Sequence, residues 1–476
     1  MTDSAILKTI SRAIRAVIPL RVQFKIGDIY SCTKLPLTER FSDAESQAWQ
    51  WFMATEDYDR TRLEKEQWAI FKSILEYAYC NVPYYRKKYD SCGVKPEDVA
   101  CYEDLPRLPL IEKEELKENF EDFIARDSDR TRCHLKQTSG TTGSPTRILL
   151  DEEGYRSYAL VVRWYRNLAR TKVGDRWVFV RRKEFKSTKE AAAYRGRYFP
   201  PANCLHFASH NLKDEAIAEY VRKLLLFKPR FIEGNSSDIY FIASYMRENK
   251  LRVHIPVVIT RTDALLEHHK PMLMEVFGPT DIFNFYGSVE QVASGMDCQL
   301  HHGKHQNMLF NMVEVLDDNK RQVFETSGSI VGTNLRNRAM PLIRYRIGDR
   351  GILSKRTCVC GKEGWQLLKI EGREGDVLIL PNGSRIAPGF IGTAPAVDLF
   401  GIKEYQLVQK RIDHIVLNVS LVKGIDHSVA EQLRENLIRL FQYEGEMAME
   451  IVDHIPRIAN KFRVIVSELN NEGSVK

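Results

Sequence analysis

Between about residues 150 and 310 the sequence alternates short apolar runs with amphipathic stretches, and few fold classes accommodate such a pattern. The apolar runs have strand length and are rich in β-branched and aromatic residues: Trp177–Val180, Phe231–Ile232, Val257–Ile259 and Ile282–Phe285. Helical periodicity separates them, over Ala216–Phe227 and Ile239–Arg247. Strands that alternate with helices predict a mostly parallel sheet covered by helices, with ligands bound where loops leave the strand ends.

The length of the chain predicts more than one domain. Its 476 residues exceed what one hydrophobic core usually supports, so we expect two or three domains. The expected parts are an N-terminal helical extension over residues 1–42, a large α/β domain over 43–372 and a small α+β domain over 373–476. In the extension, apolar and basic residues recur at helical spacing from Ile6 to Ile18. Such a helix fits docking on its own protein better than peripheral contact with a membrane.

Charge and cysteine usage limit which classes of binding partner and which cellular compartment we expect. The net charge is +7, with lysine and arginine scattered along the chain, which favours anionic small molecules over nucleic acid. No basic run with interleaved aromatic residues marks a nucleic-acid groove. The nine cysteines are mostly isolated and fit reduced thiols in a cytoplasmic protein. The lack of a long uncharged apolar span argues against a transmembrane helix.

The stretch from Gln137 to Arg147 concentrates glycine and hydroxylated residues as no other part of the sequence does. Gly140 and Gly143 permit positive φ angles and close backbone approach, so successive N–H groups can form a nest for phosphate. The hydroxyl groups of four residues add donors: Thr138, Ser139, Thr141 and Thr142. The run lacks the Lys-Ser/Thr ending of a Walker loop, which makes a P-loop NTPase the poorer fit. A simple surface turn is the alternative interpretation.

Three later stretches carry residues suited to a bound nucleotide. A strand-like run gives way to an aromatic residue, a glycine and a carboxylate, so Tyr286 could stack on a base and Glu290 could hold magnesium. The alternative is an ordinary strand end with an exposed glutamate. Asp349 stands at a glycine turn, where its carboxylate can accept hydrogen bonds from both ribose hydroxyls. Glycines flank Arg373 and precede Asp376, which suits a hinge.

Four motifs, in this order, resemble the adenylate-forming (AMP-dependent synthetase and ligase) superfamily. They are Thr-Ser-Gly-Thr-Thr-Gly at 138–143, Tyr-Gly-x-x-Glu at 286–290, Tyr-Arg-x-Gly-Asp at 345–349 and Gly-Arg-x-x-Asp at 372–376. The chain is most similar to the phenylacetate-CoA ligase and CapK branch, through Asn81–Tyr85, Leu108–Lys113 and Cys358–Gly361. The resemblance runs from about Trp51 to the C-terminus. It implies a large α/β N-terminal domain of the adenylate-forming ligase type and a small, mobile α+β C-terminal domain.

The resemblance implies an ATP-dependent ligase that activates a carboxylic acid as acyl-AMP, releases pyrophosphate, and passes the acyl group to coenzyme A or another acceptor. By resemblance, the β- and γ-phosphates bind Thr138, Ser139, Gly140, Thr141, Thr142 and Gly143. The other implied nucleotide contacts are Tyr286 near adenine with Gly287 and Ser288, Glu290 on Mg²⁺, Asp349 on the ribose, and Arg373 on ribose or phosphate. Asp376 is implied as the hinge. Lys461 is implied as the catalytic lysine that bridges carboxylate and α-phosphate, although Asn460 stands where glycine is common.

The acid and the final acceptor stay open in the sequence. We expect the acyl pocket beside residues 231–236 and 283–288, with Phe231, Asn235, Phe283 and Phe285 as lining. Coenzyme A, a carrier-protein thiol and a sugar are all compatible acceptors, and the CapK resemblance implies surface-polysaccharide biosynthesis. One rival function is a non-catalytic scaffold that binds nucleotide or polysaccharide machinery at the inner membrane face. A kinase fits poorly, because no Walker lysine or kinase catalytic loop is present.

Cysteine and histidine residues cluster in two later segments and fit a structural zinc site, which takes four thiolate or imidazole ligands. The expected ligands are Cys298, His305, Cys358 and Cys360, with His302 as a substitute. The Cys-x-Cys spacing is tighter than the usual two-residue gap, so reduced free thiols are an equal alternative.

Overall fold

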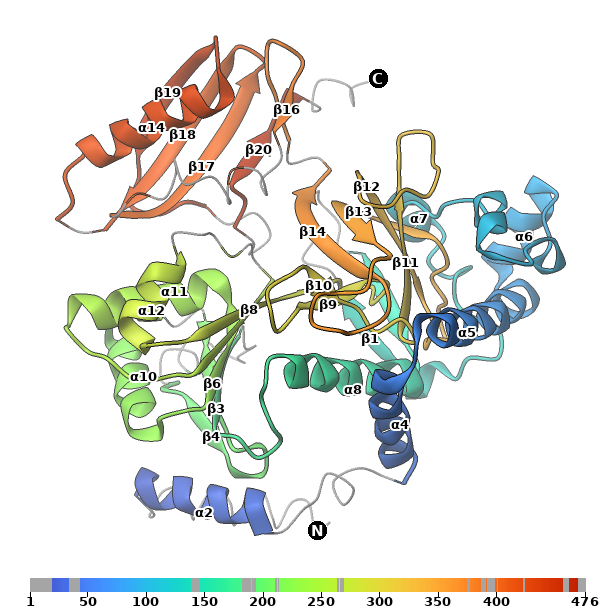
Figure 1. Ribbon diagram of the computed structural model, residues 1–476, viewed down its shortest axis with the longest axis horizontal. Helices are drawn as coiled ribbons and strands as arrows, with labels where there is room; N and C mark the ends of the chain where they lie inside the picture. The colour runs from blue at the N-terminus through green and yellow to red at the C-terminus, as the bar shows by residue number, and fades with distance from the viewer. Residues whose placement is uncertain are drawn as a thin grey trace. The chain divides into compact units, whose positions relative to one another are not determined.

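A computed structural model describes most of the chain (Figure 1). The described residues are 19–33, 43–137, 146–181, 194–209, 214–262, 269–374, 377–386, 401–422, 424–456 and 462–469, with the single residues 190, 212, 265, 391 and 399. The chain folds into two compact units. The first consists of Met1–Gln47, Ala169–Thr262 and His269–Asn284, and the second of Ala48–Leu168, Asp263–His268 and Phe285–Lys476. The expected division at residues 42 and 372 stays a prediction.

The first unit is built on a mostly parallel sheet, as the alternating pattern predicts. Its strands lie in the order β8, β7, β6, β3, β5, β4. They are β3 (Trp177–Arg181), β4 (Arg197–Phe199), β5 (Cys204–Ala208), β6 (Phe231–Asn235), β7 (Val257–Arg261) and the first part of β8 (Asp281–Gly287). All neighbours pair in parallel except β4 with β5. The central strands are buried along nearly their whole length, as strands covered on both faces are.

Helices connect the parallel strands of the first unit. The crossovers are α10 (Asp214–Phe227), α11 (Ser236–Glu248) and α12 (His269–Phe277), and α2 (Leu20–Thr33) precedes the sheet in the chain. The α2 helix is fastened by Asp28, whose carboxylate pairs with the guanidinium of Arg176. That guanidinium lowers the pKa of Asp28.

The second unit contains a wholly antiparallel run of strands, in the order β11, β12, β13, β14, β10, β9, and the end of β8. These strands are β9 (Ser294–Asp297), β10 (Lys304–His305), β11 (Asn311–Leu316), β12 (Ser327–Asn334), β13 (Tyr345–Ser354) and β14 (Gln366–Arg373). The helices before and beside them are α4 (Asp43–Ala54), α5 (Arg60–Asn81), α6 (Pro83–Cys92), α7 (Lys113–Glu118) and α8 (Glu152–Leu168). A short hairpin, β1 (His134–Gln137) with β2 (Arg147–Leu150), precedes α8.

A buried arginine fastens the N-terminal helical region to this sheet. The side chain of Arg344 is 2% exposed, and its Nε and Nη2 each lie 2.9 Å from a carboxylate oxygen of Glu314 on β11. Its Nη1 donates to the carbonyl oxygens of Leu105 and Leu108, at 2.7 and 2.6 Å. The backbone then continues the attachment, because Ile111 forms a parallel bridge with Tyr345. The Nε, Nη1 and Nη2 atoms of the Arg344 guanidinium therefore each have an acceptor, as a buried charge requires.

The C-terminal residues form a separate small α+β element with its own core. Its four-stranded sheet has the order β19, β18, β17, β20, and helix α14 (Ser428–Phe441) covers it. The strands are β17 (Ile402–Arg411), β18 (His414–Leu421), β19 (Glu446–Ile451) and β20 (Ile465–Ser467). Helix α14 buries Ala430, Leu433, Leu437 and Phe441, at the spacing of one helical face. Two short strands, β15 (Leu378–Ile379) and β16 (Arg385–Ile386), precede this sheet in the chain.

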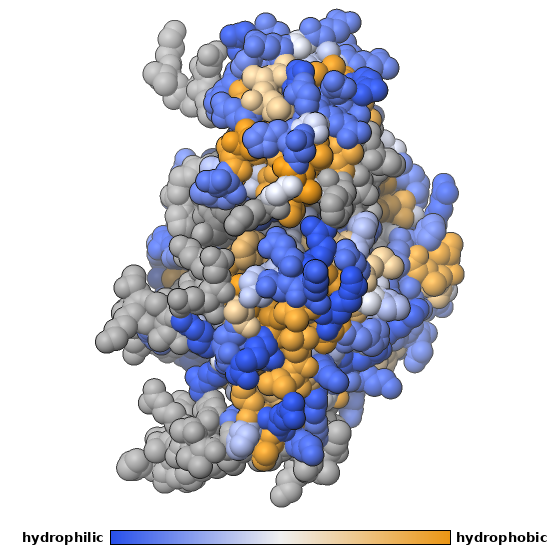
Figure 2. Space-filling model, turned by 90° about the vertical axis from the view of Figure 1, so that its left-hand side faces the viewer, coloured by the Kyte–Doolittle hydropathy of each residue, from blue (hydrophilic) through white to orange (hydrophobic). Residues whose placement is uncertain are grey.

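None of the described helices is long and apolar enough to span a bilayer. The amphipathic stretch up to Ile18 lies outside the described residues. The face of the molecule in Figure 2 is largely hydrophilic, with hydrophobic patches between. Among the described residues, the large exposed apolar side chains include Val22, Met274 and Val359. Single exposed apolar side chains are ordinary on a folded protein.

Replacing the buried arginine tests its structural role. The substitution Arg344→Met leaves the Glu314 carboxylate buried without its partner, which should lower the free energy of unfolding by about 3–5 kcal/mol. Arg356→Ala is the matched control, because Arg356 is 81% exposed and its pairing with Glu325 should be worth less than about 1 kcal/mol. Denaturant unfolding of both variants measures the difference. Equal losses of stability in the two variants would contradict the role given to Arg344.

Candidate functional site

Three of the predicted nucleotide residues come together on three strands of the second unit. Tyr286 lies near the end of β8, Asp349 lies on β13, and Arg373 is the last residue of β14. The antiparallel register of β13 and β14 places Asp349 directly opposite Arg373. Gly348, which precedes Asp349, has φ of +81°, but both residues lie inside β13, so the structure has an irregular strand here and not the glycine turn expected from the sequence.

Asp349 is the centre of this group. Its Oδ2 accepts a hydrogen bond of 2.7 Å from the Tyr286 hydroxyl, and its Oδ1 lies 3.1 Å from Nε of Arg373. Arg373 also donates through Nη1 to the carbonyl oxygen of Ile347, at 2.9 Å. Burial and the Asp349 carboxylate raise the pKa of Tyr286 well above its usual value, so its hydroxyl keeps its proton. The Asp349 carboxylate is thus held in one orientation from two sides.

Glu290 lies beside this group and is buried. It is only 8% exposed, so the alternative of an exposed glutamate after a strand end is wrong. The hydroxyl of Tyr345 donates to its Oε1 at 3.4 Å, a long hydrogen bond. Burial, with a further contribution from Glu290, raises the pKa of Tyr345. A buried carboxylate with one weak donor retains oxygen lone pairs for a cation.

The turn between β8 and β9 holds a polar atom without a partner. The Ser288 hydroxyl oxygen is buried and makes no hydrogen bond within the described residues. The turn is tight, because a Cβ at Gly287 would lie 2.8 Å from the Phe285 ring. Buried hydroxyls are normally satisfied, so the unpartnered Ser288 fits contact with a polar ligand. Val289 beside it offers no hydroxyl and is partly exposed.

The residues expected to line the acyl pocket have packing roles in the structure. In the first unit, Phe231 stacks on Trp177 with ring centroids 5.3 Å apart, and Phe283 is fully buried. Asn235 precedes α11 and donates to Asp238 at 2.9 Å. In the second unit, Phe285 meets Tyr165 edge to face. Their role as pocket lining stays a prediction.

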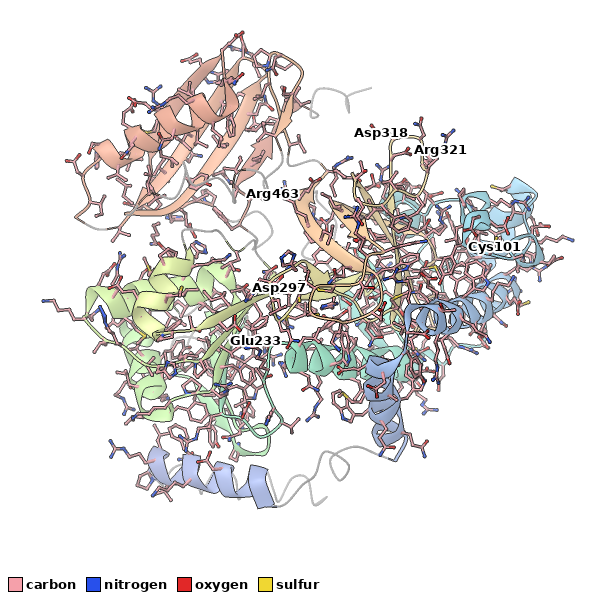
Figure 3. The ribbon with its side chains drawn as sticks, in the orientation of Figure 1. Cys101, Glu233, Asp297, Asp318, Arg321 and Arg463 are labelled. Carbon is pink, nitrogen blue, oxygen red and sulfur yellow. The ribbon has the colours of Figure 1, made fainter. Side chains whose placement is uncertain are left out.

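The sequence analysis missed a buried ion pair that joins strands β6 and β7 of the first unit. Glu233, labelled in Figure 3, is fully buried on β6, and its Oε1 lies 3.0 Å from Nη2 of Arg261 on β7. Parallel pairing of β6 with β7 brings the two side chains together across about thirty residues of chain. The sequence holds no local signal for such a pair, because it depends on strand order.

Several predicted residues fall outside the described part of the chain. These are residues 138–143, Asp376 and Lys461. Tyr345 is a residue to which the sequence analysis assigned no role, and its place at the start of the Tyr-Arg-x-Gly-Asp motif was the available signal.

The predicted zinc ligands converge in the second unit. The ligand atoms of Cys298, His305, Cys358 and Cys360 all lie within 4.8 Å of one another. The Sγ atoms of Cys298 and Cys358 are 3.5 Å apart, and Nε2 of His305 is 3.2 Å from Sγ of Cys360. His302, the proposed substitute, is not in this group. Pairing of β10 with both β9 and β14 brings the three chain segments together.

The cluster is shielded from solvent. Burial raises the pKa of Cys298 to about 12 and lowers the pKa of His305 to about 4, so the imidazole is neutral and can act as a ligand. Nearby Asp297 on β9, labelled in Figure 3, pairs with Lys304 and takes no part in the group. Three sulfurs and one nitrogen in this arrangement fit a tetrahedral zinc ion.

Known proteins resemble the chain in sequence across most of its length. Phenylacetate-coenzyme A ligase of Thermus thermophilus is 24% identical over 425 residues, covering 84% of this chain and 92% of the relative. Protein CapK of Staphylococcus aureus is 21% identical and covers 81% of this chain and 85% of the relative. A search against protein-family models gave no match.

Solved structures resemble the chain in fold. A 2-hydroxyisobutyryl-CoA ligase in its postadenylation state, 19% identical, superposes with a TM-score of 0.69 over 87% of this chain and 92% of that one. An anthranilate CoA ligase bound to anthranoyl-AMP, 16% identical, gives a TM-score of 0.51 over 71% of this chain and 66% of that one. The chain therefore has the fold of adenylate-forming CoA ligases, and its resemblance to the phenylacetate-CoA ligase and CapK branch is confirmed.

Proposed function

We propose that this protein is an ATP-dependent carboxylic acid ligase that forms an acyl-AMP, releases pyrophosphate and transfers the acyl group to coenzyme A. The observation that carries the proposal is the convergence of Tyr286, Asp349 and Arg373 beside the buried Glu290. Relatives whose sequences match most of this chain are phenylacetate-coenzyme A ligases, and the structural relatives include a ligase solved with an acyl-AMP and coenzyme A.

Each side chain of the group has a task in such a reaction. The Asp349 carboxylate, held by Tyr286 and Arg373, is suited to accept hydrogen bonds from the ribose hydroxyls. Glu290 would hold Mg²⁺, which would neutralise phosphate charge, and the Ser288 hydroxyl, which has no partner among the described residues, would donate to phosphate. In our proposal residues 138–143 bind the β- and γ-phosphates, Lys461 bridges the carboxylate and the α-phosphate, and Asp376 is the hinge. Catalysis then consists of positioning and charge neutralisation.

The acyl acceptor and the biological role are separate, more specific proposals. Coenzyme A is favoured as acceptor over a carrier-protein thiol or a sugar, because the matching relatives include coenzyme A ligases. The similarity to CapK supports a place in surface-polysaccharide biosynthesis. The non-catalytic scaffold is the rival function. A scaffold has no need of a paired Asp349 and Arg373 beside a buried Glu290, so their convergence disfavours it.

Pyrophosphate release tests the proposed activity. With ATP, Mg²⁺ and a panel of aryl, fatty, hydroxy and amino acids, one acid class should stimulate release. Lys461→Ala should reduce the rate roughly hundred-fold or more, because a preorganised charge on the reacting groups is lost. Asp349→Asn should chiefly raise the KM for ATP, because it weakens the ribose contact. Lys410→Ala is the control, because Lys410 is partly exposed and pairs with the similarly exposed Glu468 at 2.7 Å. Acid-independent release, unchanged in Lys461→Ala, would contradict the proposal.

We also propose that Cys298, His305, Cys358 and Cys360 bind a structural zinc ion. Four ligands close the coordination shell and leave no position for catalysis. The bound ion would join β9, β10 and the loop between β13 and β14, and so stabilise the sheet that carries Asp349. Because the ligands lie far apart in sequence, the ion would cross-link segments that local contacts alone hold less firmly.

Metal analysis tests the zinc site. The purified protein should contain about one zinc per chain by elemental analysis, as a closed four-ligand site requires. Cys298→Ser and Cys360→Ser should lose the metal and unfold at lower temperature. Cys92→Ser, which changes an exposed free thiol, should keep both the zinc and the stability. This assignment would be contradicted by protein that contains no zinc and whose unfolding temperature does not change when zinc or a chelator is added.

A further inference from the structure

The carboxyl ends of the parallel strands in the first unit carry charged side chains on one face of the sheet. Residues at alternate positions of a strand point to the same face, so Glu233 lies on β6 between Phe231 and Asn235. Those two flanking residues are expected from the sequence to line the acyl pocket. Arg261 is the last residue of β7 and stands opposite Asn235 in the strand register. In an open α/β sheet, ligands bind outside these strand ends.

Glu233 holds Arg261 from the interior of the sheet. The Glu233 side chain is fully buried, whereas that of Arg261 is 20% exposed, and Oε1 of the first lies 3.0 Å from Nη2 of the second. The backbone beside Glu233 is closely packed, because a Cβ at Gly234 would lie 2.6 Å from the carbonyl oxygen of Val180 on β3. The guanidinium is therefore the member of the pair that a ligand at the strand ends can reach.

A second arginine is held in the same way on β3. Arg181, the last residue of β3, is exposed, and its Nε donates to Nε2 of the buried His206 at 3.2 Å. The Tyr194 hydroxyl lies 3.2 Å from the other ring nitrogen, Nδ1, and donates to the His206 carbonyl oxygen at 3.1 Å. Because Nε2 accepts from Arg181, Nδ1 carries the proton of a neutral imidazole. The imidazole therefore orients Arg181 without cancelling its charge.

Both arginines lie beside one aromatic ring. Phe179 is on β3, in register with Glu233 on one side and with His206 on the other. The guanidinium carbon of Arg181 is 5.1 Å from the centre of the Phe179 ring, and that of Arg261 is 5.9 Å from it. These five side chains combine two guanidinium groups with one carboxylate, and the excess positive charge suits an anion.

Stability does not explain the burial of the Glu233–Arg261 pair. Taking both charges out of water costs desolvation free energy, and an apolar pair of similar volume is often as stable or more stable. A guanidinium held by a buried partner is a preorganised receptor for a carboxylate, because its planar fork matches the two carboxylate oxygens. The pair therefore fits recognition of an anionic ligand better than it fits packing.

We propose that Arg261 and Arg181 bind a second acidic group of the substrate, so that the acid activated by this protein is a dicarboxylic acid. One carboxylate reacts with ATP, and the other is bound at the ends of β3 and β7. Glu233 and His206 are positioning residues, since each acts through an arginine. The inference rests on the proposed function, because it takes these strand ends to face the acid. It names the substrate class that the proposed function leaves open.

Paired substrates test the inference on the full chain. In the pyrophosphate assay, each of a series of dicarboxylic acids is compared with the monocarboxylic acid in which a methyl group replaces the second carboxylate. We expect one dicarboxylic acid to exceed its monocarboxylic partner in kcat/KM by roughly hundred-fold or more, since a site built for a polar group rejects an analogue that lacks it. Arg181→Gln should lower that ratio roughly ten-fold, mainly by raising the KM for the dicarboxylic acid, because one charge-assisted hydrogen bond is lost.

A double variant tests the buried pair. Glu233→Gln combined with Arg261→Gln removes both charges together, so no unpaired charge stays in the interior. It should lose the preference for the dicarboxylic acid, while its affinity for ATP, measured by isothermal titration calorimetry, equals that of the wild type. Arg252→Gln is the matched control, because Arg252 belongs to the same unit and its side chain is 63% exposed beside Glu275. The control should keep the full preference.

The outcomes distinguish this inference from the proposed function. Wild-type protein that activates monocarboxylic acids as well as their dicarboxylic partners would overturn the inference and leave the proposed function intact. Weaker binding of ATP or coenzyme A to Arg181→Gln, with an unchanged preference between acids, would also overturn it, because the arginine would then bind phosphate. The exposed Arg181 decides the question if the double variant fails to fold. Failure of every acid to stimulate pyrophosphate release would overturn the proposed function and the inference together.

Discussion

The antiparallel pairing of β13 with β14 is the contact on which the candidate site depends. It sets Asp349 opposite Arg373, and a shift of one residue would send one of these side chains to the other face of the sheet. Close backbone packing fixes the register: a Cβ at Gly351 would lie 2.6 Å from the carbonyl oxygen of Lys369. A glycine is therefore needed where the two strands approach, and this close approach sets the geometry of the site.

The same strand connects distant parts of the sequence. Arg344, just before β13, holds the segment around Leu105 through its buried guanidinium. Burying this charge costs desolvation free energy, which is offset because the guanidinium has a full set of acceptors. Tyr345 next to it contacts both the N-terminal segment and Glu290. The N-terminal helices and the site are thus joined through two adjacent residues. The ligands of the proposed zinc site lie on β10, just after β9 and in the loop before β14, so a bound ion would add a third attachment.

Local sequence patterns predicted the elements well and the tertiary contacts poorly. The parallel strands of the first unit follow from short continuous apolar runs, because they are buried on both faces, and helix α14 follows from its periodic apolar stripe. The convergence of Asp349 with Arg373 was anticipated only through motif order and resemblance. The pairing of Arg344 with Glu314, and of Glu233 with Arg261, depends on strand order, which no short window of sequence contains.

The transfer of oxygen from acid to nucleotide tests the central claim most directly. If the carboxylate attacks the α-phosphate, an acid labelled with oxygen-18 in its carboxylate, incubated with ATP, Mg²⁺ and coenzyme A, should yield AMP that carries one labelled oxygen, as mass spectrometry would detect. Label in inorganic phosphate, with ADP as the nucleotide product, would mean attack on the γ-phosphate. That result would contradict the account of this protein as an adenylate-forming ligase.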